Sequence, residues 1–209
     1  MARNLDPKCK QCRRVGEKLF LKGDRCLSAK CGLVKRNFPP GQHGPKGRSK
    51  TTEYGLQLRE KQMAVKQYRM LEKQFKLTFV EAQKHHGNLS DNFVKLLEMR
   101  LDNAIYRLGL TTSRDKARQL VSHGHFVING KKVDIPSYHV RTGEVIGVRE
   151  GSKRNKEFNN LTEKLKTVKT PSWLNLEPAK LQGKVLHEPI KEDLNVNFNA
   201  QMIVEFYSR

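Results

Sequence analysis

Hydrophobic residues recur every three or four positions over the middle of the chain, which is the period of an amphipathic helix. Residues 52–86 contain no proline and predict two helices, the second ending near Gly87. Their apolar positions are Leu56, Met63 and 68–71, then Phe75, Phe79 and Ala82. A third helix is expected to begin at Ser90, which is a good N-cap, and to end at Gly109. Its apolar face carries Phe93, Leu97, Leu101, Ile105 and Leu108.

After Gly109 the predicted helices and strands are shorter. Ser113 is placed to cap a helix over 114–122, whose apolar face carries Ala117, Leu120 and Val121. Two short apolar segments on either side of Asn129-Gly130 predict a β-hairpin over 125–133, because this dipeptide favours the tight turn of such hairpins. A further strand is expected over 144–149.

The last sixty residues are harder to assign. Residues 153–168 return to a helical period, with Phe158, Leu161, Leu165 and Val168 on one side. Residues 173–176 suit a strand, and the alternation over 202–207 predicts a terminal strand. Helices combined with a small antiparallel sheet indicate an α+β fold.

Residues 37–50 form a segment of another kind, because closely spaced proline and glycine exclude helix and strand. A linker is one interpretation. The basic side chains Lys46, Arg48 and Lys50 favour an arm that runs along RNA. The segment GPKGRSKT does not fit a nucleotide-binding P-loop, because Ser49 replaces the glycine before Lys50 and no apolar strand precedes it.

The chain is strongly basic. Lys and Arg number 41 against 21 Asp and Glu, and the formal net charge is +20. Residues 1–50 alone hold 14 Lys and Arg but three Asp and Glu. Such an excess repels itself in a free protein, and a polyanionic partner would relieve it. The chain shows neither a long apolar run nor a signal-peptide pattern, so we expect a cytoplasmic protein without membrane association.

All four cysteines lie near the start of the chain, as Cys9, Cys12, Cys26 and Cys31. Two close thiol pairs joined by a short loop suit one tetrahedral zinc ion. A reducing compartment favours metal ligation over the alternative, two disulfides in an exported domain. An iron–sulfur cluster is a further alternative, because thiolates also bind iron.

The helix over 114–122 and the hairpin after it form the second candidate site. Arg114, Arg118, Gln119 and Ser122 fall opposite the apolar face, so we expect a basic and polar stripe pointing away from the core. Arginines placed in this way can bind phosphate oxygens, although an ordinary solvated helix face is the alternative. His123, His125, Lys131 and Lys132 would extend the same surface. The surplus of cations around one turn favours nucleic acid.

An enzyme is not expected. Asp102 and Asp134 are isolated acids, and Asp102 is expected to form a surface ion pair with Arg100. No cysteine lies outside the N-terminal cluster to serve as a nucleophile. An RNA-modifying enzyme would need a catalytic domain, for which the residues after the hairpin are too few. A dedicated mRNA regulator remains as a third class.

Several motifs resemble the S-four RNA-binding module, namely RLDN from Arg100, YRLG from Tyr106, SR from Ser113, ARQLV from Ala117, HGH from His123 and VING from Val127. Others resemble the bacterial small-subunit ribosomal protein S-four family, namely PPGQHG from Pro39, LREKQ from Leu58, PSY from Pro136 and VEFYSR from Val204. Many members of this family lack the cysteines, so the chain resembles its zinc-containing form.

The resemblance implies a primary binder of small-subunit (16S) rRNA that nucleates 30S assembly on a helix junction of the 5′ domain. It further implies contact with ribosomal protein S-five, at an interface linked to translational accuracy, and a place beside the path by which mRNA enters. Some family members repress their own mRNA. A homo-oligomer is not expected.

The expected organisation has five segments: a zinc knuckle (1–36), a basic arm (37–51), a helical domain (52–90), an S-four-type RNA-binding domain (91–168, core 99–150) and a C-terminal segment packing back on both domains (169–209). The expected RNA-binding residues in the first two segments are Lys35, Arg36, Gln42, His43, Lys46, Arg48 and Lys50. Those in the RNA-binding domain are Arg100, Asn103, Arg107, Ser113, Arg114, Lys116, Arg118, Gln119, Ser122, His123, Gly124, His125, Asn129, Gly130, Lys131 and Lys132.

Overall fold

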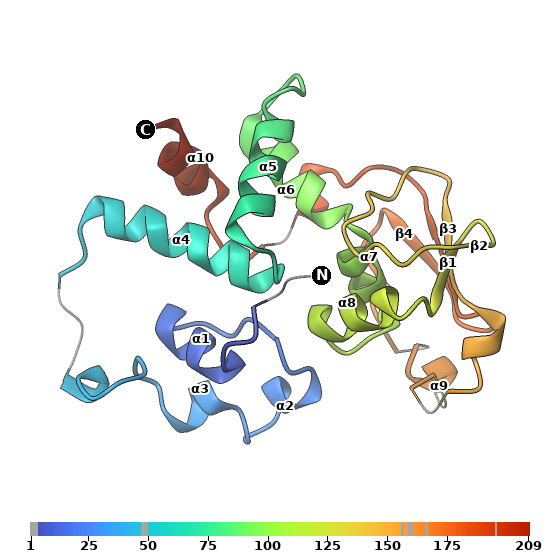
Figure 1. The fold of residues 1–209 in the computed structure, drawn as a ribbon, viewed down its shortest axis with the longest axis horizontal. Helices are drawn as coiled ribbons and strands as arrows, with labels where there is room; N and C mark the ends of the chain where they lie inside the picture. Colours follow the sequence, from blue (N-terminus) through green and yellow to red (C-terminus); the bar gives the residue numbers. More distant parts are fainter. Residues whose placement is uncertain (1–3, 47–49, 156, 159–160, 166, 195) are drawn as a thin grey trace. The chain divides into compact units, whose positions relative to one another are not determined.

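The computed structural model describes residues 4–46, 50–155, 157–158, 161–165, 167–194 and 196–209. The chain divides into two compact units, one formed by residues 1–93 with 196–209 and the other by residues 94–195 (Figure 1). Among the described residues, no helix is long and apolar enough to cross a membrane.

The first unit is helical. Its elements are α1 (Lys8–Val15), α2 (Asp24–Leu27), α3 (Gly32–Lys35), the 3₁₀ turn η1 (Gly44–Lys46), α4 (Glu53–Gln67), α5 (Glu72–Ala82), the start of α6 (Leu89–Glu98) and α10 (Ala200–Ser208). The two helices expected between residues 52 and 86 are therefore confirmed as α4 and α5. No α-helix or strand occurs in the described part of residues 37–50, which agrees with the proline and glycine content.

The C-terminal strand expected over 202–207 is wrong, because this segment is helix α10. Asn199 caps it by accepting hydrogen bonds from the backbone amides of Gln201 and Met202. The helix packs on α4, where Gln57 donates a 3.0 Å hydrogen bond to Glu205. The rings of Phe206 and Tyr54 lie 5.6 Å apart.

The single third helix is also wrong: the structure has α6 (Leu89–Glu98) and α7 (Leu101–Arg107). Arg100 between them is extended, and the amide of Leu101 donates to the carbonyl oxygen of Tyr138 over 2.8 Å. The apolar spacing continues through this break, so the pattern did not reveal it. Asn88, rather than Ser90, caps α6, since its side chain accepts the Ser90 amide over 3.0 Å.

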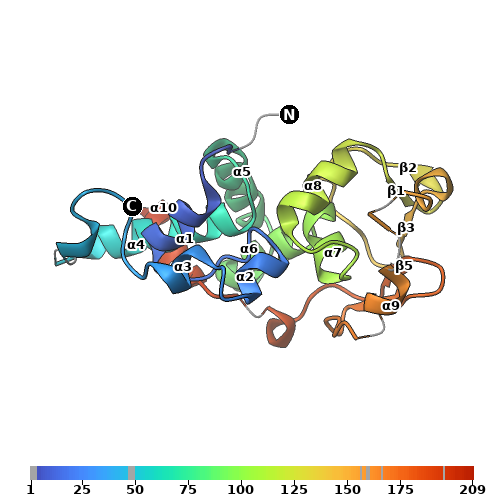
Figure 2. The ribbon, with the colours of Figure 1, turned by 90° about the horizontal axis from the view of Figure 1, so that it is seen from below.

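The second unit combines α7 and α8 (Arg114–Ser122) with an antiparallel sheet. The strand order is β2-β1-β3-β5-β4, and the strands are β1 (Phe126–Ile128), β2 (Lys131–Lys132), β3 (Val145–Val148), β4 (Leu174–Glu177) and β5 (Gln182–Val185). The helix over 114–122, the hairpin and the strands near 144–149 and 173–176 are confirmed. In both ribbon views, α7 and α8 lie on the same side of the sheet (Figures 1 and 2). The α+β fold class is confirmed.

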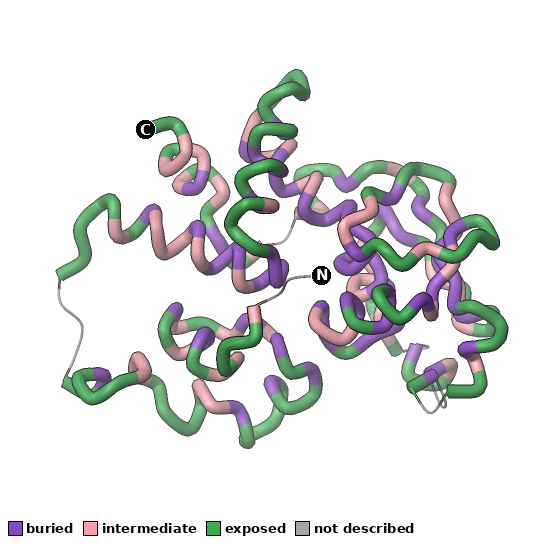
Figure 3. The backbone as a smooth tube through the Cα atoms, viewed as in Figure 1, coloured by how far each residue is buried: buried purple, intermediate pink, exposed green. Residues whose placement is uncertain are grey.

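Buried residues of the helices and the sheet, purple in Figure 3, form one hydrophobic core in this unit. Its largest members include Phe126 from β1 and Trp173, which precedes β4. Residues beyond position 150 contribute Phe158, Leu165 and Val185 as well. The core beneath the hairpin is therefore completed by residues that lie well after it in the sequence.

The long helix expected over 153–168 does not form. The described residues there contain only the short helix α9 (Leu161–Leu165), which follows the 3₁₀ turn η2 (Glu150–Ser152). Residues 156, 159–160 and 166 lie outside the described part. Phe158, Leu161 and Leu165 are nevertheless buried, so the apolar positions were correctly recognised although their secondary structure was not. A final 3₁₀ turn, η3 (Lys191–Asp193), follows β5.

Candidate nucleic-acid interface

Helix α8 leads directly into the β1–β2 hairpin through one tight turn. Ser113 caps the helix by accepting a 3.3 Å hydrogen bond from the Lys116 amide. Gly124 leaves the helix at φ +72°, a conformation that glycine adopts without strain. Asn129 and Gly130 also have positive φ, as a type I′ hairpin turn requires. The Asn129 side chain accepts the Val145 amide over 2.9 Å, which holds the tip of the hairpin against β3.

The exposed side chains of this region belong to both elements. Gln119, Ser122 and His123 are exposed at the C-terminal half of α8, and Lys131 and Lys132 are exposed on β2. Asn129 and Gly130 are exposed at the turn, while Lys116, Arg107 and His125 are partly buried. A polar and basic surface therefore runs from the end of α8 to the hairpin.

Arg149 adds a cation that the sequence analysis missed. Its amide donates to the His125 carbonyl oxygen over 2.9 Å, because β1 pairs with β3 so that Phe126 lies opposite Val148. Arg149 is exposed and follows directly on β3. The strand expected over 144–149 included Arg149. Its position beside His125 could not be predicted, because it depends on the register between β1 and β3.

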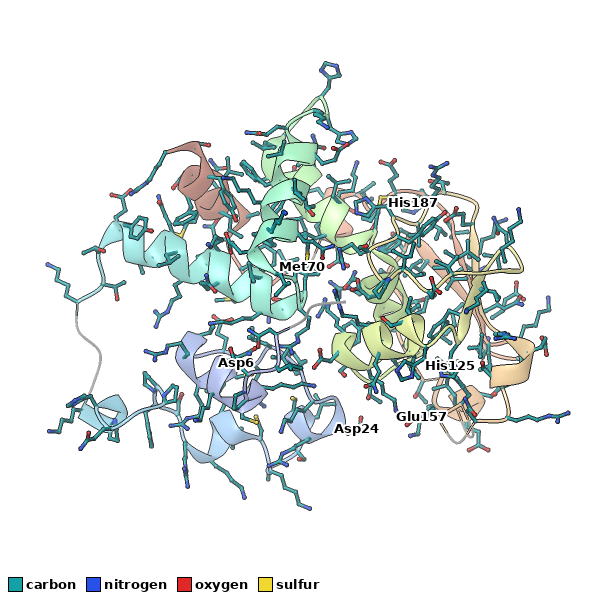
Figure 4. The ribbon with its side chains drawn as sticks, viewed as in Figure 1. Asp6, Asp24, Met70, His125, Glu157 and His187 are labelled. Atoms are coloured by element: carbon teal, nitrogen blue, oxygen red, sulfur yellow. The ribbon has the colours of Figure 1, made fainter. Side chains whose placement is uncertain are left out.

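His125 (labelled in Figure 4) is paired with this cation through the backbone hydrogen bond just described. Burial lowers the pKa of its imidazole below the usual value, and His123 and Arg149 lower it further. Its Nδ1 lies 3.0 Å from the Ser152 hydroxyl. The lowered pKa favours the neutral imidazole, which offers hydrogen-bonding capacity rather than charge to the surface.

The exposed arginine stripe expected on α8 is wrong. Arg114 and Arg118 are only 7% and 5% exposed. Arg118 donates to Asp102 over 3.3 Å, and Arg114 donates to the Asn103 side chain over 2.7 Å. The pair of Arg100 and Asp102 forms as expected, with distances of 3.1 and 2.9 Å, but it is buried rather than on the surface. Other predicted contacts that are buried are Asn103, Ser113 and Gly124.

The basic arm is anchored at its beginning. Arg13 on α1 donates to the carbonyl oxygens of Phe38 and Pro39 over 2.9 and 3.3 Å, and its guanidinium lies 4.9 Å from the centre of the Phe38 ring. The predicted RNA contacts that are exposed around this anchor are Lys35, Arg36, Gln42, His43, Lys46 and Lys50. Arg48 lies outside the described residues.

Replacing Gly44 by alanine is expected to distort the arm. A Cβ at this position would collide with the backbone oxygen of Pro39, which cannot turn aside as a flexible side chain can. We expect affinity for structured RNA to fall several-fold in filter-binding titrations, with an unchanged salt dependence because no cation is lost. Gly41→Ala is not a matched control because Gly41 has φ +113°, so Asn37→Ala serves instead, since Asn37 is exposed and is not among the predicted RNA contacts. Wild-type affinity in Gly44→Ala would contradict the expectation.

All four cysteines are free thiols and line one pocket, with Cys26 on α2 (Asp24 in Figure 4 marks the start of that helix). Lys22 and Arg25 line the same pocket. The Lys22 amide donates to the Cys26 sulfur over 3.3 Å. A Cβ on Gly32 would lie 2.9 Å from the Cys9 Cβ, so glycine is needed for this close approach.

The thiols in the pocket differ in acidity. Burial raises the pKa of Cys12, despite a backbone hydrogen bond from Leu19. Burial also acts to raise the pKa of Cys31, but backbone hydrogen bonds from Val34 and Leu33, with Lys18 and Arg25, outweigh it and lower the pKa. Amide and cationic surroundings of this kind favour thiolates, which are the form that binds metal.

The donor set therefore fits a four-thiolate metal site, and zinc in particular. The four cysteine side chains do not form a metal site in the conformation of this structure. In the described residues, no group of three or more His, Cys, Asp or Glu is arranged to hold a metal ion.

Comparisons with known proteins agree with the two units. Residues 3–98 match the model of the ribosomal protein S4/S9 N-terminal domain, and residues 99–146 match the S4 domain. The small ribosomal subunit proteins uS4 of Halothermothrix orenii and Syntrophomonas wolfei are each 50% identical to the chain over 209 residues, covering the full length of both proteins. The protein uS4A of Clostridium novyi is similar to the same extent. With motifs, fold and full-length similarity in agreement, the chain belongs to the small ribosomal subunit protein uS4 family.

Proposed function

We propose that the chain is a primary binder of small-subunit (16S) rRNA, which holds a helix junction of the 5′ domain and thereby nucleates 30S assembly. Membership of the uS4 family makes it a structural, non-enzymatic constituent of the small ribosomal subunit, acting in the cytoplasm. Holding RNA helices in one orientation lowers the entropy cost of later binding steps, which is how a structural protein orders assembly.

The observation that supports rRNA binding most is the surface formed by α8 and the hairpin. Exposed Lys131 and Lys132 on β2, together with Arg149 after β3, present positive charge from a sheet whose register is set by backbone pairing. Cations held on a rigid scaffold release counterions from RNA phosphates without first having to be ordered. Gln119, Ser122 and His123 add hydrogen-bonding groups beside them.

One zinc ion bound by Cys9, Cys12, Cys26 and Cys31 forms part of the proposal. It is supported by the shared pocket, the free thiols and the lowered pKa of Cys31. A structural zinc ion would crosslink α1, α2 and the residue that precedes α3, so that the exposed Lys35 and Arg36 are held in place.

Three further roles rest on the family resemblance alone. They are contact with ribosomal protein S-five at an interface linked to accuracy, a position beside the path by which mRNA enters the subunit, and repression of the protein's own mRNA. Copurification in stoichiometric amounts with small subunits would distinguish a ribosomal constituent from a dedicated mRNA regulator.

Replacing Lys131 and Lys132 by alanine tests the surface. If both contact phosphates, the slope of log affinity against log salt concentration should become shallower by about 0.7 to 0.9 for each lost contact. The measurement is binding to a transcript of the 5′ domain over a salt series, with a structured RNA of equal length as competitor.

The control for this variant is Lys180→Ala with Lys191→Ala, which removes two exposed cations elsewhere in the same unit. An equal change of slope in the control would mean that only net charge matters. Removal of wild-type binding by the competitor at physiological salt would overturn specific rRNA binding itself.

A further inference from the structure

Two buried carboxylates organise four arginines between α7 and α8. Asp102 accepts both Nε and Nη2 of Arg100, over 3.1 and 2.9 Å, and also accepts Arg118 of α8 over 3.3 Å. The exposed fractions of these three side chains are 4%, 2% and 6%. One carboxylate from α7 therefore holds a guanidinium from α8 and another from the residue before α7.

The second carboxylate acts through an amide. Glu98 accepts two hydrogen bonds from Arg107 and one from the Asn103 side chain, each over 2.8 Å. Asn103 in turn accepts Arg114 Nε over 2.7 Å. The Arg114 guanidinium also lies 4.6 Å from the centre of the Tyr106 ring. Both arginines of α8 are thus tied to consecutive residues of α7.

The backbone holds Asp102 firmly in this position. Its amide donates to the Pro136 carbonyl oxygen over 3.2 Å, and the preceding amide of Leu101 donates to Tyr138 over 2.8 Å. Arg100 pairs with His139 in an isolated β-bridge. The anchor for α8 is therefore fixed by segments on both sides of the hairpin and does not depend on α8 itself.

To contact a phosphate directly, the Arg118 guanidinium would have to leave its buried position beside Asp102. Burial lowers its pKa, and Arg100 lowers it further, whereas Asp102 raises it. A buried guanidinium is costly unless it is paired and hydrogen-bonded, and the native partner supplies both. Lys131 and Lys132 are already exposed on β2, and the 3.8 Å ion pair of Lys132 with Asp134 is exposed as well.

We propose that Arg114 and Arg118 are positioning residues for rRNA binding: through Asn103 and Asp102 they set the orientation of α8, and they do not touch the RNA. This inference rests on the proposed rRNA-binding function and assigns contact to the exposed groups alone. Gln119 and Ser122, on the same helix, reach the RNA only when α8 is held at the correct angle to the hairpin.

The test compares two variants that each remove two positive charges. Arg114→Met with Arg118→Met removes the buried pair while keeping much of its volume and leaving Asp102 paired with Arg100. Lys131→Ala with Lys132→Ala removes the exposed pair. Affinity for the 5′-domain transcript is measured over a salt series, at temperatures where circular dichroism and the emission of Trp173 show each variant fully folded.

We expect the arginine variant to bind the transcript about tenfold more weakly, which corresponds to the coupling energy of a hydrogen-bonded network of this kind. The slope of its log affinity against log salt concentration should be unchanged, because no phosphate contact is lost. The lysine variant should show a shallower slope, by about 1.4 to 1.8 in total. A slope that falls equally in the arginine variant would make Arg114 and Arg118 phosphate contacts and overturn the inference.

Unchanged affinity in the folded arginine variant would overturn the inference as well, since the network would then serve stability alone. Arg118→Met by itself provides a milder variant if the double variant does not fold, with the same two criteria. Failure of the proposed function is distinguishable, because wild-type binding would then already be removed by the competitor RNA.

Discussion

Replacing Cys26 by serine is expected to abolish stoichiometric zinc binding and to unfold the segment around the cysteine pocket. Cys26 is buried on the four-residue helix α2, which is too short to be stable without tertiary contacts. In the zinc-bound protein, most of the free energy that holds this segment would come from the metal. Structural zinc sites in small peptides contribute roughly 10–16 kcal/mol at pH 7.

The measurement is elemental analysis of the native protein and of the variant, with limited proteolysis of residues 4–36 as the readout for folding. Ser28→Ala is the matched control, because Ser28 is exposed just after α2 and lies outside the pocket. Iron in place of zinc, or no metal in the native protein, would contradict the proposal. One zinc ion retained by Cys26→Ser would remove Cys26 from the ligand set.

Replacing Phe126 by alanine is expected to destabilise the second unit by about 3–5 kcal/mol. Phe126, the first residue of β1, is 0% exposed, and its ring lies 6.1 Å from that of Phe158. Truncation would leave a cavity between the hairpin and downstream chain. Because whole domains are stable by only about 5–15 kcal/mol, this loss would remove a large part of the total.

Urea unfolding followed by tryptophan emission suits this prediction. Trp173 is the single tryptophan of the chain and is buried in the same core, so its emission reports the second unit specifically. Ile135→Ala is the control, because Ile135 is 52% exposed and its truncation should cost less than about 0.5 kcal/mol. A midpoint for Phe126→Ala equal to that of the control would show that the cavity collapses without cost.

The local elements of the candidate interface could be predicted because their signals are short-range. Ser113 caps α8, Asn129-Gly130 makes the hairpin turn, and a strand follows the turn at Gly143. Each depends on the residue's own conformational preferences and on near neighbours. The motifs that resemble the S-four family occur in the same region and led to the correct family.

Secondary structure that depends on contacts with residues far away in the sequence was predicted less well. The break between α6 and α7 comes from pairing with residues near Tyr138, and the apolar spacing passes through it unchanged. Residues 202–207 fit the strand period, because apolar and polar residues partly alternate, and also the helical period, because Ile203 and Phe206 are three positions apart. Packing against α4 and the Asn199 cap select the helix.

The charge of the protein, its four-cysteine cluster, most of its local elements and, through its motifs, its family can be obtained from the amino-acid sequence. Which basic side chains are exposed at the candidate interface depends on how the helices pack against one another. Helical periodicity placed Arg114 and Arg118 on an outer face, but Asn103 and Asp102 of α7 cover them. Periodicity reports which residues share a face of one helix. Whether that face meets solvent or a buried carboxylate depends on the neighbouring helix, and that is set by the packing of the whole unit.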